Sequence, residues 1–175
     1  MPIAVDDDGI DVGQLAAADP DAVVVTPAHS LPGGAVLAAE RRLALVEWAR
    51  GRGALVLEDD YDAELRYDRR GPAGTLQGLA PDVVVLAGSV SKTLAPALRL
   101  AWLCLPADAI AAATIARASL DGGGPRFDEL ALADLIASGA FDRHVRAARA
   151  HNREKRAALL AALATHLPDA RVRGI

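Results

Sequence analysis

The chain has 175 residues, which is enough for one domain of ordinary size, and its 52% hydrophobic residues allow a sizeable core. A net charge of −4 and an aromatic content of only 3% argue against a general nucleic-acid-binding surface. The lone Cys104 excludes an internal disulfide framework, and the acidic start lacks the basic segment of a signal peptide. No apolar run approaches the roughly 20 residues of a membrane helix. We therefore expect a cytoplasmic protein.

The first fifty residues predict short elements separated by turns. Residues 1–12 are expected to be extended and exposed. The acidic run Asp6–Asp8 lacks the further ligand positions and the closing Glu of a calcium loop, and therefore predicts a solvated turn. The predicted elements that follow are a helix over 11–18, a β-branched strand over 22–25, a loop over 28–34 and a helix over about 36–50.

A predicted strand over 54–57 runs directly into Glu58-Asp59-Asp60-Tyr61. Open α/β sheets bind ligands just past the C-terminal ends of their strands, so this acidic group marks a candidate site. A Walker B motif fits the same pattern, but it would precede any Walker A motif, and that motif is itself defective here. A metal cluster lacks a nearby histidine to complete it. Residues 62–78 are polar, contain Gly and Pro, and predict an irregular segment.

The stretch 82–105 holds the most unusual residue of the chain, Lys92, in a loop of small hydroxyl residues after a predicted strand over 83–87. Three interpretations are open from the residues alone. A P-loop is disfavoured because Ser91 stands where glycine is required. A Schiff-base lysine would have Ser89, Ser91 and Arg99 placed to hold a phosphate. The third interpretation is a solvated surface lysine.

The last part of the chain predicts helices over 108–120, 127–138 and 141–167 after a second apolar strand over 100–105. The basic residues of the last helix mostly predict a solvated face. Strands alternate with helices in the first half, which predicts an α/β layered domain with a largely parallel sheet. No helix separates the last two strands, so this pair either runs antiparallel or is joined by a short turn over 93–96.

Three motifs in this order carry a resemblance to a known family: TPAHSLPGG at 26–34, LEDDYDAELRY at 57–67 and GSVSKTLAPALRLAWL at 88–103. They resemble the aminotransferase-like domain of MocR-type GntR regulators and, more broadly, class I/II aminotransferases among the fold-type I pyridoxal-phosphate (PLP) enzymes. The resemblance implies part of a three-layer α/β large domain over 1–140, with a mostly parallel sheet. Residues 141–175 would form a long helix that leads toward a small domain missing from the chain.

The resemblance also implies a role for seven residues. Lys92 would form the internal aldimine with PLP, Asp59 would face the pyridine nitrogen, and Tyr61 would hydrogen-bond the 3-oxygen of the ring. The other implied cofactor-binding residues are Ser89 and Arg99 at the phosphate, Ser91 as a weaker phosphate ligand, and His29, after which Ser30 replaces the usual Gln. Elementary chemistry agrees, because a protonated ring nitrogen needs a carboxylate beside it and an arginine fork suits a phosphate.

The implied function is a PLP-binding fragment of a MocR/GntR-type transcriptional regulator that senses a small amino-acid-like effector. The alternatives are a fragment of a genuine aminotransferase and a non-catalytic structural remnant. The resemblance implies a homodimer, and DNA binding only through a winged-helix domain that this chain lacks. We therefore expect the chain to be an internal piece of the fold.

Overall fold

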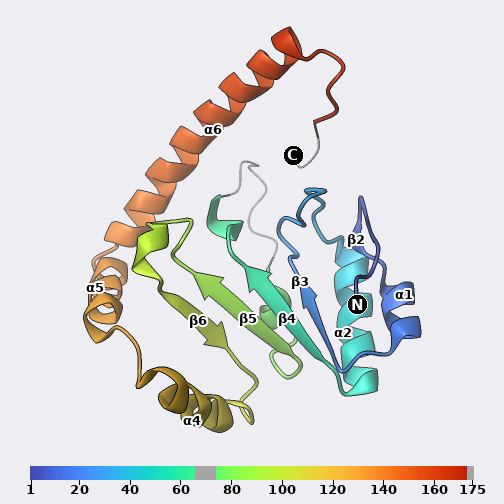
Figure 1. Cartoon of the computed structure of the whole chain (residues 1–175), viewed down its shortest axis with the longest axis vertical. Helices are drawn as coiled ribbons and strands as arrows, with labels where there is room; N and C mark the ends of the chain where they lie inside the picture. The colour runs from blue at the N-terminus through green and yellow to red at the C-terminus, as the bar shows by residue number, and fades with distance from the viewer. Residues whose placement is uncertain (66–73, 173–175) are drawn as a thin grey trace.

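The computed structural model describes residues 1–65 and 74–172 (Figure 1). A small hairpin and a helix open the chain, a sheet with covering helices follows, and three helices end it. The elements are β1 (Val5–Asp6), β2 (Gly9–Ile10), α1 (Val12–Ala18), β3 (Ala22–Val25), α2 (Ala39–Arg52), β4 (Leu55–Asp60), the 3-10 turn η1 (Ala63–Leu65), α3 (Leu76–Leu79), β5 (Val84–Ser89), the 3-10 turn η2 (Pro96–Leu98), β6 (Ala101–Cys104), α4 (Ile110–Asp121), α5 (Arg126–Ala137) and α6 (Ala140–His166).

The main sheet has the strand order β3-β4-β5-β6. The first three strands are parallel, with Val23 opposite Val56 and Val56 opposite Val84. β6 runs antiparallel to β5, with Ser89 opposite Ala101. The predicted α/β class with a largely parallel sheet is confirmed. The antiparallel last pair is one of the two arrangements that the sequence left open.

One face of the sheet carries the hydrophobic core. Alternate residues of a strand point to the same face, so Val23, Val56 and Val84 lie together, and each is at most 8% exposed. Helices pack over this face through their apolar residues. The buried core comprises Ile10, Leu15, Val23, Val25, Leu37, Leu45, Val46, Ala49, Val56, Leu76, Ala80 and Val84.

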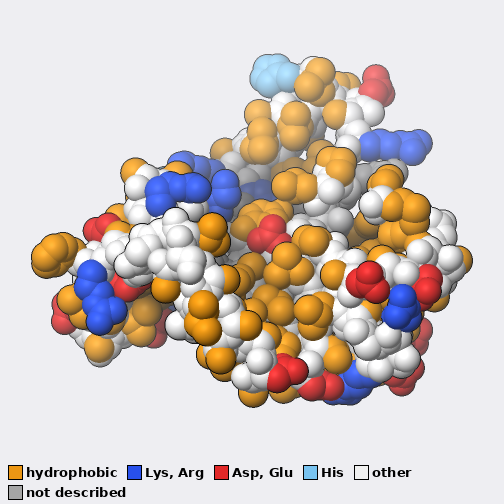
Figure 2. Space-filling view, turned by 60° about the horizontal axis from the view of Figure 1, so that its bottom comes forward, with side chains coloured by type: hydrophobic (Ala, Val, Ile, Leu, Met, Phe, Trp, Pro, Cys, Tyr) orange, Lys and Arg blue, Asp and Glu red, His pale blue; other side chains and the backbone are white. Residues whose placement is uncertain are grey.

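The opposite face of the sheet leaves apolar side chains in solvent. Val24, Leu55 and Leu103 are 64%, 45% and 56% exposed. Figure 2 shows hydrophobic side chains gathered across the middle of one face of the molecule. The C-terminal helices pass beside β6, and α6 extends well beyond the sheet (Figure 1). This second face is therefore an open apolar surface among the described residues.

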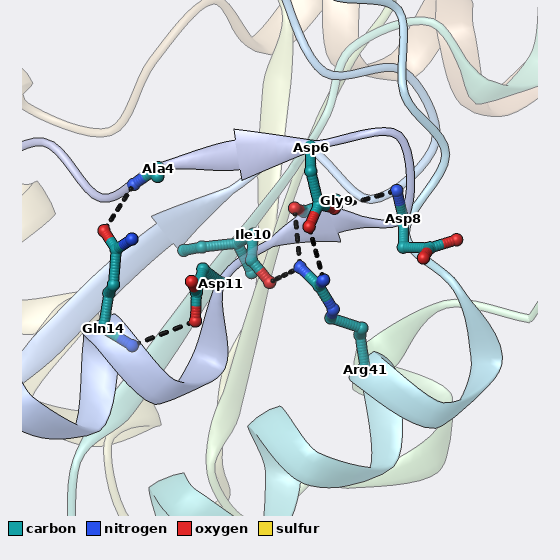
Figure 3. Close-up of polar contacts among 8 residues, drawn as sticks. All are labelled: Ala4, Asp6, Asp8, Gly9, Ile10, Asp11, Gln14 and Arg41. Atoms are coloured by element: carbon teal, nitrogen blue, oxygen red, sulfur yellow. Dashed lines mark hydrogen bonds and ion pairs between the residues drawn. The ribbon is translucent and has the colours of Figure 1, made fainter.

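The N-terminal residues are more ordered than an extended, exposed segment. β1 and β2 pair as an antiparallel hairpin, and Gly9 and Ile10 are buried, so the expectation of exposure is wrong there. Arg41 of α2 holds the hairpin, because its guanidinium donates to the carbonyls of Gly9 and Ile10 at 3.0 and 2.7 Å and to Asp6 at 2.6 Å (Figure 3). The turn at Asp6–Asp8 is thus an attachment point for α2.

Several element bounds differ from the predicted ones. The largest difference is β4, which continues through Glu58 and Asp59 to Asp60 because the ladder to β5 extends as far as Gly88. The acids therefore lie in the strand and not past its end. The irregular segment predicted over 62–78 lies partly outside the described residues, and its described ends hold η1 and α3. The predicted division into 1–140 and 141–175 stays a prediction.

Among the described residues, no helix combines the length and apolar character needed to cross a membrane.

Candidate cofactor site

The candidate site lies at the edge of the sheet where the parallel strands end. Since β3, β4 and β5 are parallel, the segments that follow them begin at the same edge. These segments carry His29, Tyr61 and Lys92 respectively. β6 is antiparallel and starts at this edge, so Arg99 just before it is brought to the same place. The topology thus collects the three sequence motifs at one end of the sheet (Figure 1).

Asp59 and Ser89 share one face of the sheet. Asp59 lies opposite Ala87 on the neighbouring strand, and Ser89 follows Ala87 by two residues. Paired residues and residues two apart on a strand point to the same side, so both side chains are on the face opposite the core. Both are partly buried. A carboxylate and a hydroxyl therefore flank the end of the β4–β5 pair on its open face.

The loop that carries Lys92 is closed by backbone hydrogen bonds. The amide of Val90 donates to the carbonyl of Leu100 at 3.2 Å, and the amide of Leu94 donates to the carbonyl of Val90 at 2.8 Å. Ser89 Oγ accepts from the amide of Ser91 at 3.3 Å. Val90 and Leu100 are buried and anchor the two ends of the loop. The loop is thus a defined turn.

Lys92 and Arg99 are both exposed. Of the three interpretations open for Lys92, exposure fits a solvated lysine most simply, and it leaves the amine at the turn accessible to a ligand. Arg99 follows η2 with φ +54°, in the left-handed region that residues other than glycine seldom adopt. Two basic residues, Lys92 and Arg99, therefore lie exposed to solvent at the edge of the sheet near Ser89. An anionic ligand can approach them there.

His29, Tyr61 and Asp62 form a connected polar group. His29 Nδ1 lies 3.0 Å from Asp62 Oδ1, and the phenol of Tyr61 donates to the carbonyl of His29 at 3.1 Å. Burial, together with the negative charges of Asp62 and Asp59, raises the pKa of the Tyr61 phenol, so it stays protonated at neutral pH. Sequence reasoning names His29 and Tyr61 but not Asp62, whose position only the fold reveals.

The acids on either side of Asp59 face the core side of the sheet. Glu58 is only 3% exposed, and its carboxylate accepts from the amides of Leu76 and Gln77 at 2.9 Å each, at the start of α3. Burial raises the pKa of Glu58 and, likewise, that of Asp60. Of the three consecutive acids, Asp59 alone is directed to the open face. Glu58 has a structural role that the sequence pattern did not indicate.

Two side chains of α6 reach the segments around the site. His144 Nε2 lies 2.7 Å from the carbonyl oxygen of Thr93, next to Lys92. Arg149 Nε donates to the carbonyl of Glu64 in η1. Sequence reasoning assigns the basic residues of this helix mostly to a solvated face, and the partly buried Arg149 is an exception. The spacing of the two residues, five apart on one helix, does not by itself reveal these contacts.

Comparison with solved structures identifies the fold. Over 97% of this chain and 44% of the other, the structure superposes on kynurenine aminotransferase from Pyrococcus horikoshii, solved in a complex with PMP, with a TM-score of 0.88 and 27% identity. The fold is the aminotransferase fold. The aminotransferase fold accounts for the strand order, the antiparallel last strand and the helices after it as part of a fold-type I domain.

Two curated relatives of this aminotransferase-like chain are transcriptional regulators. The HTH-type regulator YdeL from Bacillus subtilis is 34% identical over 99% of the chain, and the probable rhizopine catabolism regulatory protein MocR from Rhizobium meliloti is 32% identical over 97%. The chain spans 38% and 34% of their respective lengths. No family model matches the chain. Its homologues are thus MocR/GntR-type regulators, as the motifs indicated.

Proposed function

We propose that this chain binds PLP through Lys92 as the aminotransferase-like part of a MocR-type regulator. The observation that carries the proposal is the arrangement at one sheet edge: Asp59 and Ser89 share the open face, and the Lys92 loop and Arg99 stand beside them. The donor set fits the cofactor, because it offers an amine for an aldehyde, a carboxylate for a ring nitrogen and a cation for a phosphate. When bound, PLP supplies an electron sink.

Each remaining residue has a role that its own chemistry supports. Arg99 would bind the phosphate with its fork of N–H donors, and Ser89 would add a hydroxyl, with Ser91 as a further donor. The protonated phenol of Tyr61 would donate to the 3-oxygen after leaving the carbonyl of His29. His29, held by Asp62, would border the ring. The regulator role further implies a small amino-acid-like effector, a homodimer, DNA binding by a separate winged-helix domain, and a cytoplasmic location.

The test is a titration of the chain with PLP, followed by absorbance and by thermal unfolding. Binding to the folded state should shift the unfolding temperature upward with cofactor concentration. Arg99→Ala should weaken binding roughly tenfold to a hundredfold, since a charged hydrogen bond contributes about 1.5–3 kcal/mol. Arg126→Ala, at an exposed arginine on α5, is the matched control and should bind like the unchanged chain. Equal affinity of all three chains would refute the phosphate assignment.

A genuine aminotransferase is the second candidate, and it is favoured by the 27% identity to an enzyme of that kind. The site residues proposed above would serve either function, because sensing and catalysis can share one site. Transfer of an amino group to a keto acid, measured after PLP loading, separates the two. We expect no transfer from this chain.

A further inference from the structure

The second turn of α6 contacts the loop that carries Lys92. His144 Nε2 lies 2.7 Å from the carbonyl oxygen of Thr93, 51 residues earlier in the chain. A carbonyl oxygen can only accept, so the imidazole must donate through Nε2. This bond joins the last long helix to the residue next to the amine.

Thr93 is well placed to define the direction of Lys92. Its side chain is only 3% exposed, and Val90 and Leu100 are 1% and 7% exposed, so the loop is anchored on the core side. Lys92 itself is exposed. The bond from His144 holds the main chain of the loop at the carbonyl of Thr93. Thr93 follows Lys92 directly, so loss of this bond would loosen the backbone next to the lysine.

The helix is itself held against the other site segment. Arg149 donates to the carbonyl of Glu64, in the turn that follows Tyr61 and Asp62. Val145, adjacent to His144, is 5% exposed and seats this part of α6 against the rest of the molecule. One helix therefore spans the loop after β5 and the turn after β4, and it sets their relative position.

We propose that His144 is a positioning residue, which holds the Lys92 loop in the geometry required for cofactor binding by donating to the carbonyl of Thr93. The proposal rests on the proposed function for the role of Lys92. The hold on the loop itself is a property of the chain without cofactor. It can therefore be measured separately.

The first test is hydrogen exchange of the cofactor-free chain, read by mass spectrometry in peptides that cover 89–99. His144→Ala should speed exchange there roughly two- to tenfold, the factor that one net hydrogen bond represents, and leave α2 unchanged. His144→Gln, which keeps an N–H donor of similar reach, should restore the protection. His151→Ala, at an exposed histidine of the same helix, should have no effect. Unchanged exchange in His144→Ala, a general rise across the chain, or failure of Gln to restore protection would each overturn the proposal.

The second test adds PLP to the same variants. His144→Ala should lower the absorbance of the lysine-linked cofactor at a given PLP concentration, under conditions where the variant is fully folded without PLP, and His144→Gln should recover it. If the unchanged chain gives no such absorbance, the proposed function fails, and the exchange result still decides whether His144 holds the loop. Absorbance in His144→Ala equal to that of the unchanged chain would overturn the positioning role.

Discussion

At the scale of single residues, Glu58 makes the clearest prediction about pH. Burial raises the pKa of its carboxyl, which means that the folded state favours the protonated form. The stability it contributes is fully present below its unfolded pKa of about 4.3 and is lost as the pH rises through the higher folded value. Glu58→Gln removes this titration. The variant should therefore gain stability relative to the unchanged chain between acidic and neutral pH, measured by urea unfolding.

Asp82 provides the opposite control for this experiment. Its hydrogen bonds from Arg50, at 2.7 and 2.8 Å, lower the pKa of the Asp82 carboxyl. Its contribution is present at neutral pH and is lost as the pH falls through that lower value. Asp82→Asn should thus lose stability relative to the unchanged chain as the pH rises. If the free energies of unfolding of Glu58→Gln and of the unchanged chain differ by the same amount at every pH, the raised pKa of Glu58 is contradicted.

At the scale of elements, the cap of α1 is open to direct test. Asp11 Oδ1 accepts from the amide of Gln14 at 3.0 Å, in the first turn of the helix (Figure 3). Loss of such a cap costs about 0.5–2 kcal/mol, so Asp11→Ala should lower the free energy of unfolding by that amount. Asp11→Asn keeps an equally good cap and should cost little. If both variants are equally destabilised, the cap is not what stabilises the start of α1.

The elements also show how far sequence patterns determine this fold. The strand 22–25 has the bounds predicted for it, because three consecutive valines favour a strand and Pro27 follows. The helix predicted over about 36–50 ends two residues later, at Arg52, and the following Gly53 adopts φ +70°. β4 instead ends three residues later than predicted, because pairing with β5 outweighs the low strand propensity of Asp59 and Asp60.

The sequence predicts candidate site residues, but it does not predict the contacts between them. The motifs point to His29, Tyr61 and Lys92 because the resemblance identifies them. The bonds between His29 and Asp62 and between His144 and Thr93 join residues 33 and 51 positions apart, and no local pattern encodes such pairs. The exposure of Lys92 likewise depends on which segments cover the loop, and this is a property of the whole fold.

At the scale of the whole molecule, the two faces of the sheet predict opposite responses to mutation. Val23 is 8% exposed on the core face, and the adjacent Val24 is 64% exposed on the open face. Val23→Ala should destabilise the chain by about 1–3 kcal/mol through the cavity that it leaves. Val24→Ala should change stability by less than about 0.5 kcal/mol. Equal losses, measured by denaturant unfolding, would show that the open face is packed in solution.

The claim that connects these scales is that one amine, at the tip of a turn, receives the cofactor. Borohydride reduction of the PLP-treated chain, followed by peptide mass spectrometry, tests it most directly, because reduction makes the link between lysine and cofactor permanent. We predict a phosphopyridoxyl group on Lys92, absent after Lys92→Arg, with the exposed Lys155 of α6 unmodified as an internal control. Labelling of Lys155 to the same extent as Lys92, or an unmodified Lys92, would contradict the account.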